Sequence, residues 1–244
     1  MTVHIDFYTV RPEVYRYAKI DYAMNFLPNW YKDLSVKNYD SRCPGGVQYS
    51  MKGCYGFREL FKRSLILPLW SDVNIFLGKA GTDLAHWNFS DACSSITVNT
   101  ERDYGSFLDA TRIQSLKFES PWYAFTKSDV NFCYVQPTWN TMKYSDTLHI
   151  LPGLMDFKHQ SGTHINMALS RKPEDKILEL KHGMPLVHIM PLTEEKVKIK
   201  HHLADEKEMF NRVKNQGVGM GFPIFGGHLS FLGWMNKMKK LPRG

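Results

Sequence analysis

The stretch from Leu151 to Leu192 constrains the fold most, because it divides into short β-strand patterns separated by proline and glycine. A Pro-Gly turn signal leads to Asp156, and residues 163–169 then alternate apolar and polar side chains, as a half-buried strand does. A basic loop and two further strand patterns follow, which we expect to pair with each other around Gly183. The stretch therefore predicts β-structure for this part of the chain.

Composition extends this expectation to the whole molecule. The chain has 244 residues, of which 43% are hydrophobic, and this is enough to bury a sizeable core. Aromatic residues make up 14%, and with 12 prolines they favour short strands over a helical bundle. We expect a mainly β protein with a few short helices, as a compact barrel or sandwich. Residues 1–200 would form one domain, and residues 201–244 a helix with a Gly/aromatic tail that packs on the protein itself or on a partner.

Several local patterns support this expectation. Residues 3–10 alternate as a strand with one buried face, and residues 65–77 contain two apolar strands interrupted by a proline. Residues 55–64 carry apolar side chains at helical spacing, and residues 204–215 can form a second amphipathic helix. Residues 122–135 are typical of a hairpin with its turn at the polar Lys-Ser-Asp sequence.

The formal charge of +7 and the isoelectric point near 9.1 permit anionic partners. The basic residues are spread along the chain, which favours an ordinary solvated surface over a nucleic-acid site. One short basic cluster stands near the end of the chain, at Lys237, Lys239, Lys240 and Arg243.

Cysteine usage and apolar runs indicate the compartment. No signal-peptide pattern and no CxxC pair is present, so we expect reduced thiols in an intracellular protein. The longest apolar run, from Leu65 to Trp70, is far shorter than the ~20 residues of a membrane-spanning helix. The sequence thus predicts a soluble protein without a membrane partner. The four cysteines are Cys43, Cys54, Cys93 and Cys133.

Asp156 is the first candidate for chemistry, since an acid after a tight turn at the start of a strand can activate water when it is oriented by a partner. The sequence GLMD, followed by a β-arm and LELKHGMPLVHI, resembles the third motif and the following strands of dUTPases and dCTP deaminases. The resemblance implies a dUTPase-like β-clip fold that assembles into trimers. It also implies a role for Asp156 in supporting the attacking water or recognising the sugar. An aromatic side chain near the acid stacks on the base in that family, and Phe157 stands next to Asp156 here.

Two departures from the dUTPase pattern count against an intact nucleotide hydrolase. No Arg/Ser phosphate-binding motif precedes the acid, because Arg63 and Ser64 lie far upstream behind an expected helix. The glycine-rich GVGMGFPIFGG near the C-terminus lacks the Arg and Ser/Thr donors of the family's phosphate-closing arm. The competing interpretation makes Asp156 an acid that stabilises its own turn through nearby backbone N–H groups.

A wider resemblance covers most of the chain. The ordered segments RCPGG, LILPLWSDV, SPWYAFTK, VQP, LPGLMD and HGMPLVHIMPL resemble a family of uncharacterised proteins of tailed phages, marine (cyanophage-type) ones in particular. This resemblance implies a viral origin and carries no activity over to any residue.

Two other site classes stay open. Asp156 lies close in sequence to several histidines, and three such groups can hold a metal ion, although their spacing is weak evidence. Aromatic residues beside Lys117 and Lys127 are compatible with a nucleic-acid stacking surface, but they are more typical of a core wall. The histidines in question are His159, His164, His182, His188, His201 and His202.

Nucleophilic catalysis lacks the motifs that it needs: no GxSxG, no GxxxxGK[ST] and no HExxH occurs. We therefore expect a structural component of a tailed-phage virion, located in the particle or in the host cytoplasm during infection. Its partners would be copies of itself and other phage proteins, without metal or cofactor. The alternative is a dUTPase-like enzyme or nucleotide binder, with Asp156 as the catalytic acid, Phe157 at the nucleotide and Mg²⁺ as the cofactor.

Overall fold

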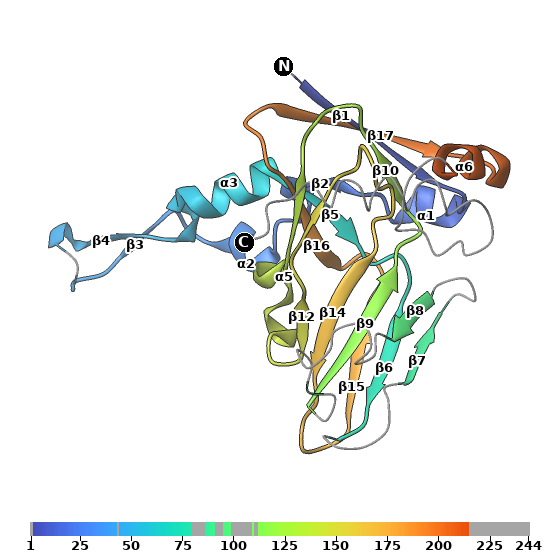
Figure 1. Ribbon diagram of the computed structural model, residues 1–244. Coiled ribbons are helices and arrows are strands. Elements are labelled where there is room, and N and C mark those ends of the chain that lie inside the picture. The colour runs from blue at the N-terminus through green and yellow to red at the C-terminus, as the bar shows by residue number, and fades with distance from the viewer. Residues whose placement is uncertain are drawn as a thin grey trace, which may run out of the picture.

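The computed structural model describes residues 2–42, 44–79, 86–90, 95–98, 109 and 112–214. This part of the chain is mainly β with a few short helices, which confirms the predicted fold class. The strands form several open sheets that pack around one large hydrophobic core, and no sheet among these residues closes into a barrel. The arrangement is therefore sandwich-like (Figure 1).

Two sheets build the sandwich proper. The first has the order β12 (Leu148–Ile150), β14 (Ile165–Ser170), β9 (Ile113–Glu119) and β8 (Ser95–Val98). The second has the order β15 (Lys176–Leu180), β6 (Val73–Leu77) and β7 (His86–Phe89). Alternate residues of both sheets, such as Leu116 and Ile75, belong to the same buried cluster. The alternation of apolar and polar residues thus gives each sheet one apolar face, and the apolar faces of the two sheets pack against each other.

A five-stranded sheet continues the core. Its order is β13 (Gly153–Met155), β11 (Phe132–Val135), β16 (Pro185–Pro191), β5 (Leu65–Pro68) and β2 (Asp21–Tyr22). All four residues of β5 are buried. This explains its continuous apolar sequence, because both of its faces lie inside the protein.

A fourth sheet has the order β10 (Tyr123–Phe125), β1 (Thr2–Thr9) and β17 (Lys196–Leu203), with β1 and β17 parallel. Val3, Ile5 and Phe7 of β1 point into the core, where Phe7 packs edge-on against Trp122. One end of the opposite face is covered by α6 (Glu206–Val213), which packs on Tyr8. The predicted helix over 204–215 is thereby confirmed, except that Phe210 is 47% exposed and is not part of the buried face.

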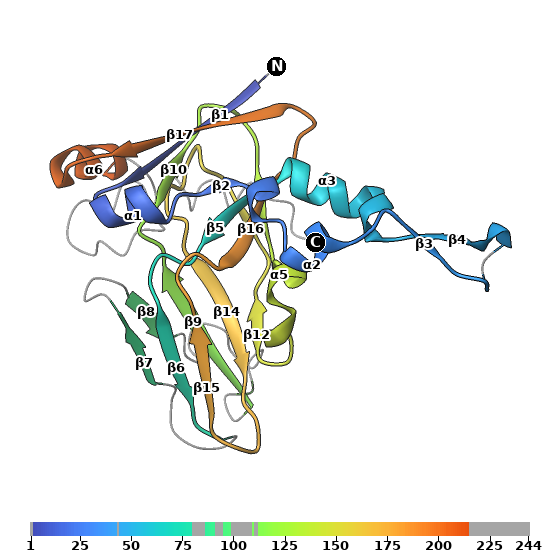
Figure 2. The same cartoon turned by 180° about the vertical axis from the view of Figure 1, so that it is seen from behind.

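A narrow arm projects from this body in both ribbon views (Figures 1 and 2). It consists of β3 (Lys37–Tyr39) and β4 (Val47–Tyr49), which form a separate two-stranded ribbon. The helix α3 (Tyr55–Arg63) leads from the arm back to the body, and Phe57 and Phe61 bury its apolar face as predicted.

The remaining short helices lie between the strands. They are α1 (Pro12–Tyr17), η1 (Ala23–Phe26), α2 (Asn29–Asp33), η2 (Pro44–Gly46), η3 (Met51–Gly53), α5 (Thr138–Thr141) and η5 (Met142–Tyr144). No helix among the described residues is long and apolar enough to cross a membrane.

Two predicted strand pairs are wrong. The strands β10 and β11 do not form a hairpin, since β10 pairs with β1 whereas β11 pairs with β13 and β16. The strands on either side of Gly183 do not pair with each other either, because β15 pairs with β6 and β16 pairs with β5 and β11. In both places a short polar turn carries the chain from one sheet to another. Turn residues in a sequence show where the chain reverses but not which strand it joins next.

Candidate functional site

Asp156, the predicted catalytic acid, stands in the turn after β13. Its side chain accepts hydrogen bonds from the backbone N–H of Lys158 (3.1 Å) and from Nδ1 of His159 (2.8 Å). Its carbonyl oxygen accepts two more, from the N–H groups of His159 and Gln160. This is the geometry of an acid that stabilises its own turn, which is the competing interpretation of the same residue.

Phe157, the predicted nucleotide-binding residue, lies in the hydrophobic core. Its side chain is 0% exposed, and its ring centroid is 4.8 Å from that of Phe132. Base stacking needs an aromatic face that a ligand can reach. In this conformation both Phe157 and its neighbour Phe132 use their rings for packing.

The candidate metal ligands are dispersed. No group of three or more His, Cys, Asp or Glu residues within the described ranges is placed to hold a metal ion. His159 bonds Asp156, whereas His201 contacts the carbonyl oxygen of Ile20 at 2.6 Å and His202 contacts Asp6 at 2.7 Å. Each of these histidines thus has a local structural partner.

His188 is fully buried beside a serine. Its Nδ1 atom lies 2.8 Å from Oγ of Ser64, and its Nε2 atom is buried without a hydrogen-bond partner. Burial lowers the pKa of His188 to about 4, so the ring is neutral near pH 7. A serine and a histidine in contact are two parts of a nucleophilic site, but here neither has an exposed atom that a substrate could reach.

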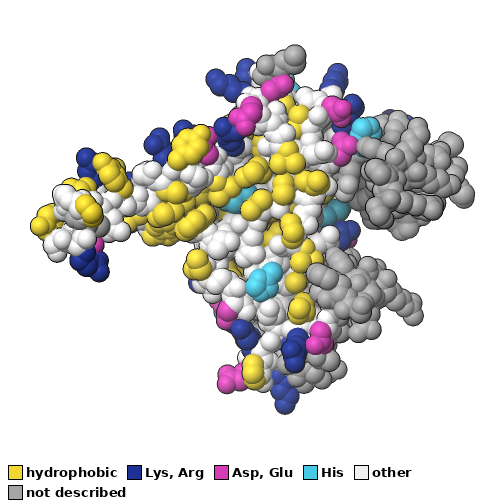
Figure 3. All heavy atoms as spheres, turned by 60° about the vertical axis from the view of Figure 1, so that its left-hand side comes forward, with side chains coloured by type: hydrophobic (Ala, Val, Ile, Leu, Met, Phe, Trp, Pro, Cys, Tyr) yellow, Lys and Arg dark blue, Asp and Glu magenta, His cyan; other side chains and the backbone are white. Residues whose placement is uncertain are grey.

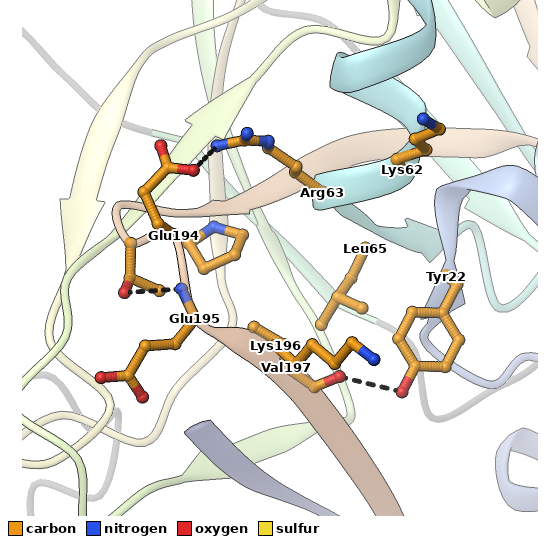
Figure 4. Close-up of a pocket in the computed structure, with 10 residues that line it drawn as sticks. Tyr22, Lys62, Arg63, Leu65, Glu194, Glu195, Lys196 and Val197 are labelled. Atoms are coloured by element: carbon orange, nitrogen blue, oxygen red, sulfur yellow. Dashed lines mark hydrogen bonds and ion pairs between the residues drawn. The ribbon is translucent and has the colours of Figure 1, made fainter. Parts of the chain in front are cut away.

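A pocket with a volume of about 320 Å³ opens where β5 and β16 meet the start of β17 (Figure 4). Lys62 and Arg63 enter it from the end of α3, and Tyr22 from β2. The other lining residues are Leu65, Pro191, Thr193, Glu194, Glu195, Lys196 and Val197.

The charges of this pocket are mixed and largely paired. Arg63 binds Glu194 at 2.5 Å and Glu59 at 3.0 Å, while the hydroxyl of Tyr22 donates to the carbonyl oxygen of Val197 at 3.1 Å. Lys196 projects into the same space in Figure 4 without a dashed contact. The pocket offers charged recognition groups but no nucleophile with an adjacent base, so it fits binding better than catalysis.

The β3–β4 arm has the most unusual surface. All six strand residues are exposed, and Tyr39 is 84% exposed and Tyr49 64%. The strand register places Lys37 opposite Tyr49 and Tyr39 opposite Val47, so these four side chains share one face of the ribbon. Figure 3 shows hydrophobic side chains along the arm and on the surface that adjoins it.

The arm is attached to the body by aromatic packing. Tyr31 of α2 stacks on Phe57 of α3 with centroids 4.3 Å apart, and Trp30 and Trp139 both contact Phe57 edge-on. The ammonium of Lys52 also donates to the carbonyl oxygen of Lys32 at 2.8 Å. The base of the arm is therefore held firmly while its faces stay open.

Hydrogen bonding determines which backbone groups of the arm point outward. Backbone hydrogen bonds of 3.0 and 3.1 Å close the ribbon at its two ends, between Ser50 and Val36 and between Asp40 and Gly46. Hydrogen-bonded pairs alternate along an antiparallel ladder, so Asn38 and Gln48 bond each other between these ends. The backbone groups of the alternate residues face away from the ribbon, namely those of Lys37, Tyr39, Val47 and Tyr49.

Comparison with protein-family models and with curated proteins found no match for this chain.

Sequence reasoning recognised the turn at the tip of the arm but not the arm. The sequence Cys-Pro-Gly-Gly at 43–46 is typical of a turn, and Gly45 and Gly46 adopt φ values of 79° and 69°. The flanking strands were missed because each has only three residues and carries polar side chains. The usable signal was the placement of one tyrosine on each side of the turn. Cys43 and the Gly/aromatic tail from residue 217 lie outside the described residues.

Proposed function

We propose that this chain is a structural subunit of a tailed-phage particle and that its β3–β4 arm joins copies of the chain. The observation that carries the proposal is the arm, a projecting ribbon whose aromatic face is exposed and whose edges pair with no other strand among the described residues. Its location would be the virion, or the host cytoplasm before assembly. The phage assignment itself rests on the sequence resemblance described above.

Energetics favour a contact for the arm. An isolated two-stranded ribbon is marginally stable in water, because it has little apolar surface to bury. Tyr39, Val47 and Tyr49 leave much of their apolar surface in solvent. Contact with another chain would bury this surface at roughly 25 cal/mol per Å² of apolar area. The sequence of the arm is therefore better suited to an assembled state than to an isolated one.

The β4 edge is the better edge for pairing. The β3 edge presents Lys37 and is followed by Asp40, and charges on an edge strand oppose pairing with another strand. The β4 edge, Val47–Tyr49, has no charged residue. Pairing of this edge with the same edge of a second copy gives a two-fold contact, which is the commonest form of self-association.

The register of this contact follows from the outward-facing groups. A two-fold axis at Gln48 places Val47 opposite Tyr49 of the second copy, twice, as hydrogen-bonded pairs. Gln48 then faces Gln48 as a non-hydrogen-bonded pair, with Cα atoms about 4.5 Å apart. The contact is small, so a pair of free chains would associate weakly. In a particle, many such contacts act together.

A disulfide test follows from this geometry, because Cα atoms about 4.4–6.8 Å apart can be bridged. Gln48→Cys would be made in a full-length chain whose four native cysteines are replaced by serine. We expect a covalent dimer under mild oxidation. Asn38→Cys is the matched control, since it is exposed at the equivalent place on β3, and we expect it to stay monomeric. Equal dimer yields from the two variants would overturn the β4 contact.

The dUTPase-like alternative gains no observation of its own from the fold. The carboxylate of Asp156 is bonded within its turn, and the ring of Phe157 is packed in the core. We therefore put forward the assembly role alone.

A further inference from the structure

We infer that the outer face of the β10–β1–β17 sheet binds the phosphate backbone of a nucleic acid. This goes beyond the proposed assembly role, because it concerns a different surface and a different class of partner. The face is the side of the sheet opposite the core, beyond the end that α6 covers (Figure 1).

A row of lysines lies on β17. Lys196, Lys198 and Lys200 are exposed, whereas the alternating Val197 and Ile199 are partly buried against the core. Residues two apart on a strand point to the same face, about 7 Å from each other. Three positive charges therefore stand in line along one strand.

The neighbouring strands add positive or ionisable groups beside this row. His4 is exposed on the central strand β1, and its register partner on β17 is Lys198. On the other side of β1 from this row, Thr126 donates from Oγ1 to the carbonyl oxygen of His4 at 2.7 Å, and the exposed Lys127 follows it in the chain. The row thus extends across the sheet as well as along it.

Further basic residues lie past the start of β17, and those on α3 are ion-paired with Glu59 and Glu194. Lys196 lines the 320 Å³ pocket together with Lys62 and Arg63 from α3. Basic groups from two distant parts of the sequence, α3 and the start of β17, meet here, and the linear charge pattern does not show this proximity. Folding gathers residues that the sequence spreads out.

Two acidic groups on this surface have partners, whereas Glu195, which lines the pocket beside Lys196, forms no ion pair among the described residues. Asp6 is the register partner of Lys200, and its carboxylate binds Nε2 of His202 at 2.7 Å. Glu194 binds Arg63 at 2.5 Å. By contrast, none of Lys127, Lys196, Lys198 and Lys200 forms an ion pair within the described part of the chain. The face therefore keeps an uncompensated positive charge.

Edge protection is the competing explanation, because lysines on an edge strand discourage pairing with other chains, and β17 is an edge of its sheet in the part of the chain that the structure describes. It accounts for β17 alone. It does not account for His4 on the central strand or for Lys127 beside it. A polyanion with regularly spaced charges fits the whole set, and a phosphate backbone is such a polyanion.

Fluorescence anisotropy with labelled 20-nucleotide single-stranded and duplex DNA tests this inference on the full chain. The face variant is Lys196→Gln/Lys198→Gln/Lys200→Gln. The control variant is Lys79→Gln/Lys143→Gln/Lys172→Gln, which removes the same charge around the far end of the sandwich, where β6 ends and β15 begins. Circular dichroism would verify that both variants fold like the wild type.

We expect the face variant to bind roughly tenfold more weakly or worse, and the control variant to lose no more than about twofold. The slope of log affinity against log salt should fall by about 2 for single strands in the face variant, because each phosphate contact contributes about 0.7.

Three results would overturn the inference: equal losses in the two variants, no binding by the wild type at low salt, or tighter binding to polyglutamate than to DNA. The last would assign the face to an acidic protein. None of these results bears on the Gln48→Cys dimer, so the two proposals fail separately.

Discussion

Ser64 and His188 form a buried pair in which the serine hydroxyl determines the tautomer of the histidine. Oγ of Ser64 lies 2.5 Å from the carbonyl oxygen of Leu60 and 2.8 Å from Nδ1 of His188. The hydroxyl has one hydrogen, and a carbonyl oxygen can only accept, so the hydroxyl donates to Leu60. Nδ1 of His188 must then carry the hydrogen and donate to Ser64. This pair joins the end of α3 to β16.

Ser64→Ala should lower the free energy of unfolding by about 1–3 kcal/mol, since it leaves the Nδ1–H of His188 buried without an acceptor. Urea unfolding would measure the loss. Ser145→Ala is the control, because Ser145 is exposed, and its effect should stay within about 0.5 kcal/mol. Similar losses in both variants would show that the pair contributes no special stability.

His188 should also make the protein sensitive to acid. Burial lowers its pKa to about 4 in the folded protein, whereas the unfolded chain titrates near the ordinary value of 6.5. The unfolded state therefore binds the proton first, and stability falls as pH drops through this window, by up to about 1.4 kcal/mol per pH unit.

Urea unfolding of His188→Asn between pH 4.5 and 6.5 tests this expectation. The variant should lose stability less steeply on acidification than the wild type, and the exposed His86→Asn should retain the wild-type slope. Burial lowers the pKa of His164 to about 4 as well, so part of the slope should remain. An unchanged slope in His188→Asn would contradict this assignment.

Gly46 should be required for the shape of the arm. Its φ is 69°, and an added Cβ would lie 2.9 Å from Cε2 of Tyr39. Gly46→Ala would therefore strain the turn and displace the tyrosine, which should reduce the yield of the Gln48→Cys dimer. Gly153→Ala meets no atom within 4 Å and serves as the control. If neither substitution changes the dimer yield, the turn at Gly46 does not determine the geometry of the contact.

Asp156 should be dispensable for any nucleotide chemistry. We expect the wild type and Asp156→Asn to release equal amounts of pyrophosphate from deoxynucleoside triphosphates in the presence of Mg²⁺, because the Asp156 carboxylate is bonded within its turn. A release that the wild type shows and the Asn variant lacks would restore the enzyme alternative.

Much of the fold could be predicted from the sequence because its signals are local. The alternation in β1 and the continuous apolar run of β5 each mark a strand by the side chains that it buries. The helical spacing of Phe57 and Phe61 marked α3 in the same way. These patterns are visible in the sequence because buried positions carry apolar side chains and exposed positions carry polar ones.

Strand partners and interaction surfaces could not be predicted, since they depend on residues far apart in the chain. The sequence places Tyr123–Phe125 near Phe132–Val135, yet the first strand joins β1 and the second joins β16. Likewise, Lys127 and Lys198 lie on either side of β1 only after folding, because Thr126 bonds the carbonyl oxygen of His4 and Lys198 is the register partner of His4. The sequence pattern placed Asp156 at the start of a strand, whereas it follows the end of β13, and its two carboxylate oxygens bond within the turn there, as the turn-stabilising interpretation predicts.

The central claim, that this chain is a particle subunit, is tested most directly by quantitative mass spectrometry of density-purified particles from a phage that carries the gene. We expect the chain to co-purify with the particles at a fixed ratio to the major capsid protein, through repeated washing at high salt. Its absence from the particles, while it is abundant in the infected-cell lysate, would contradict the account.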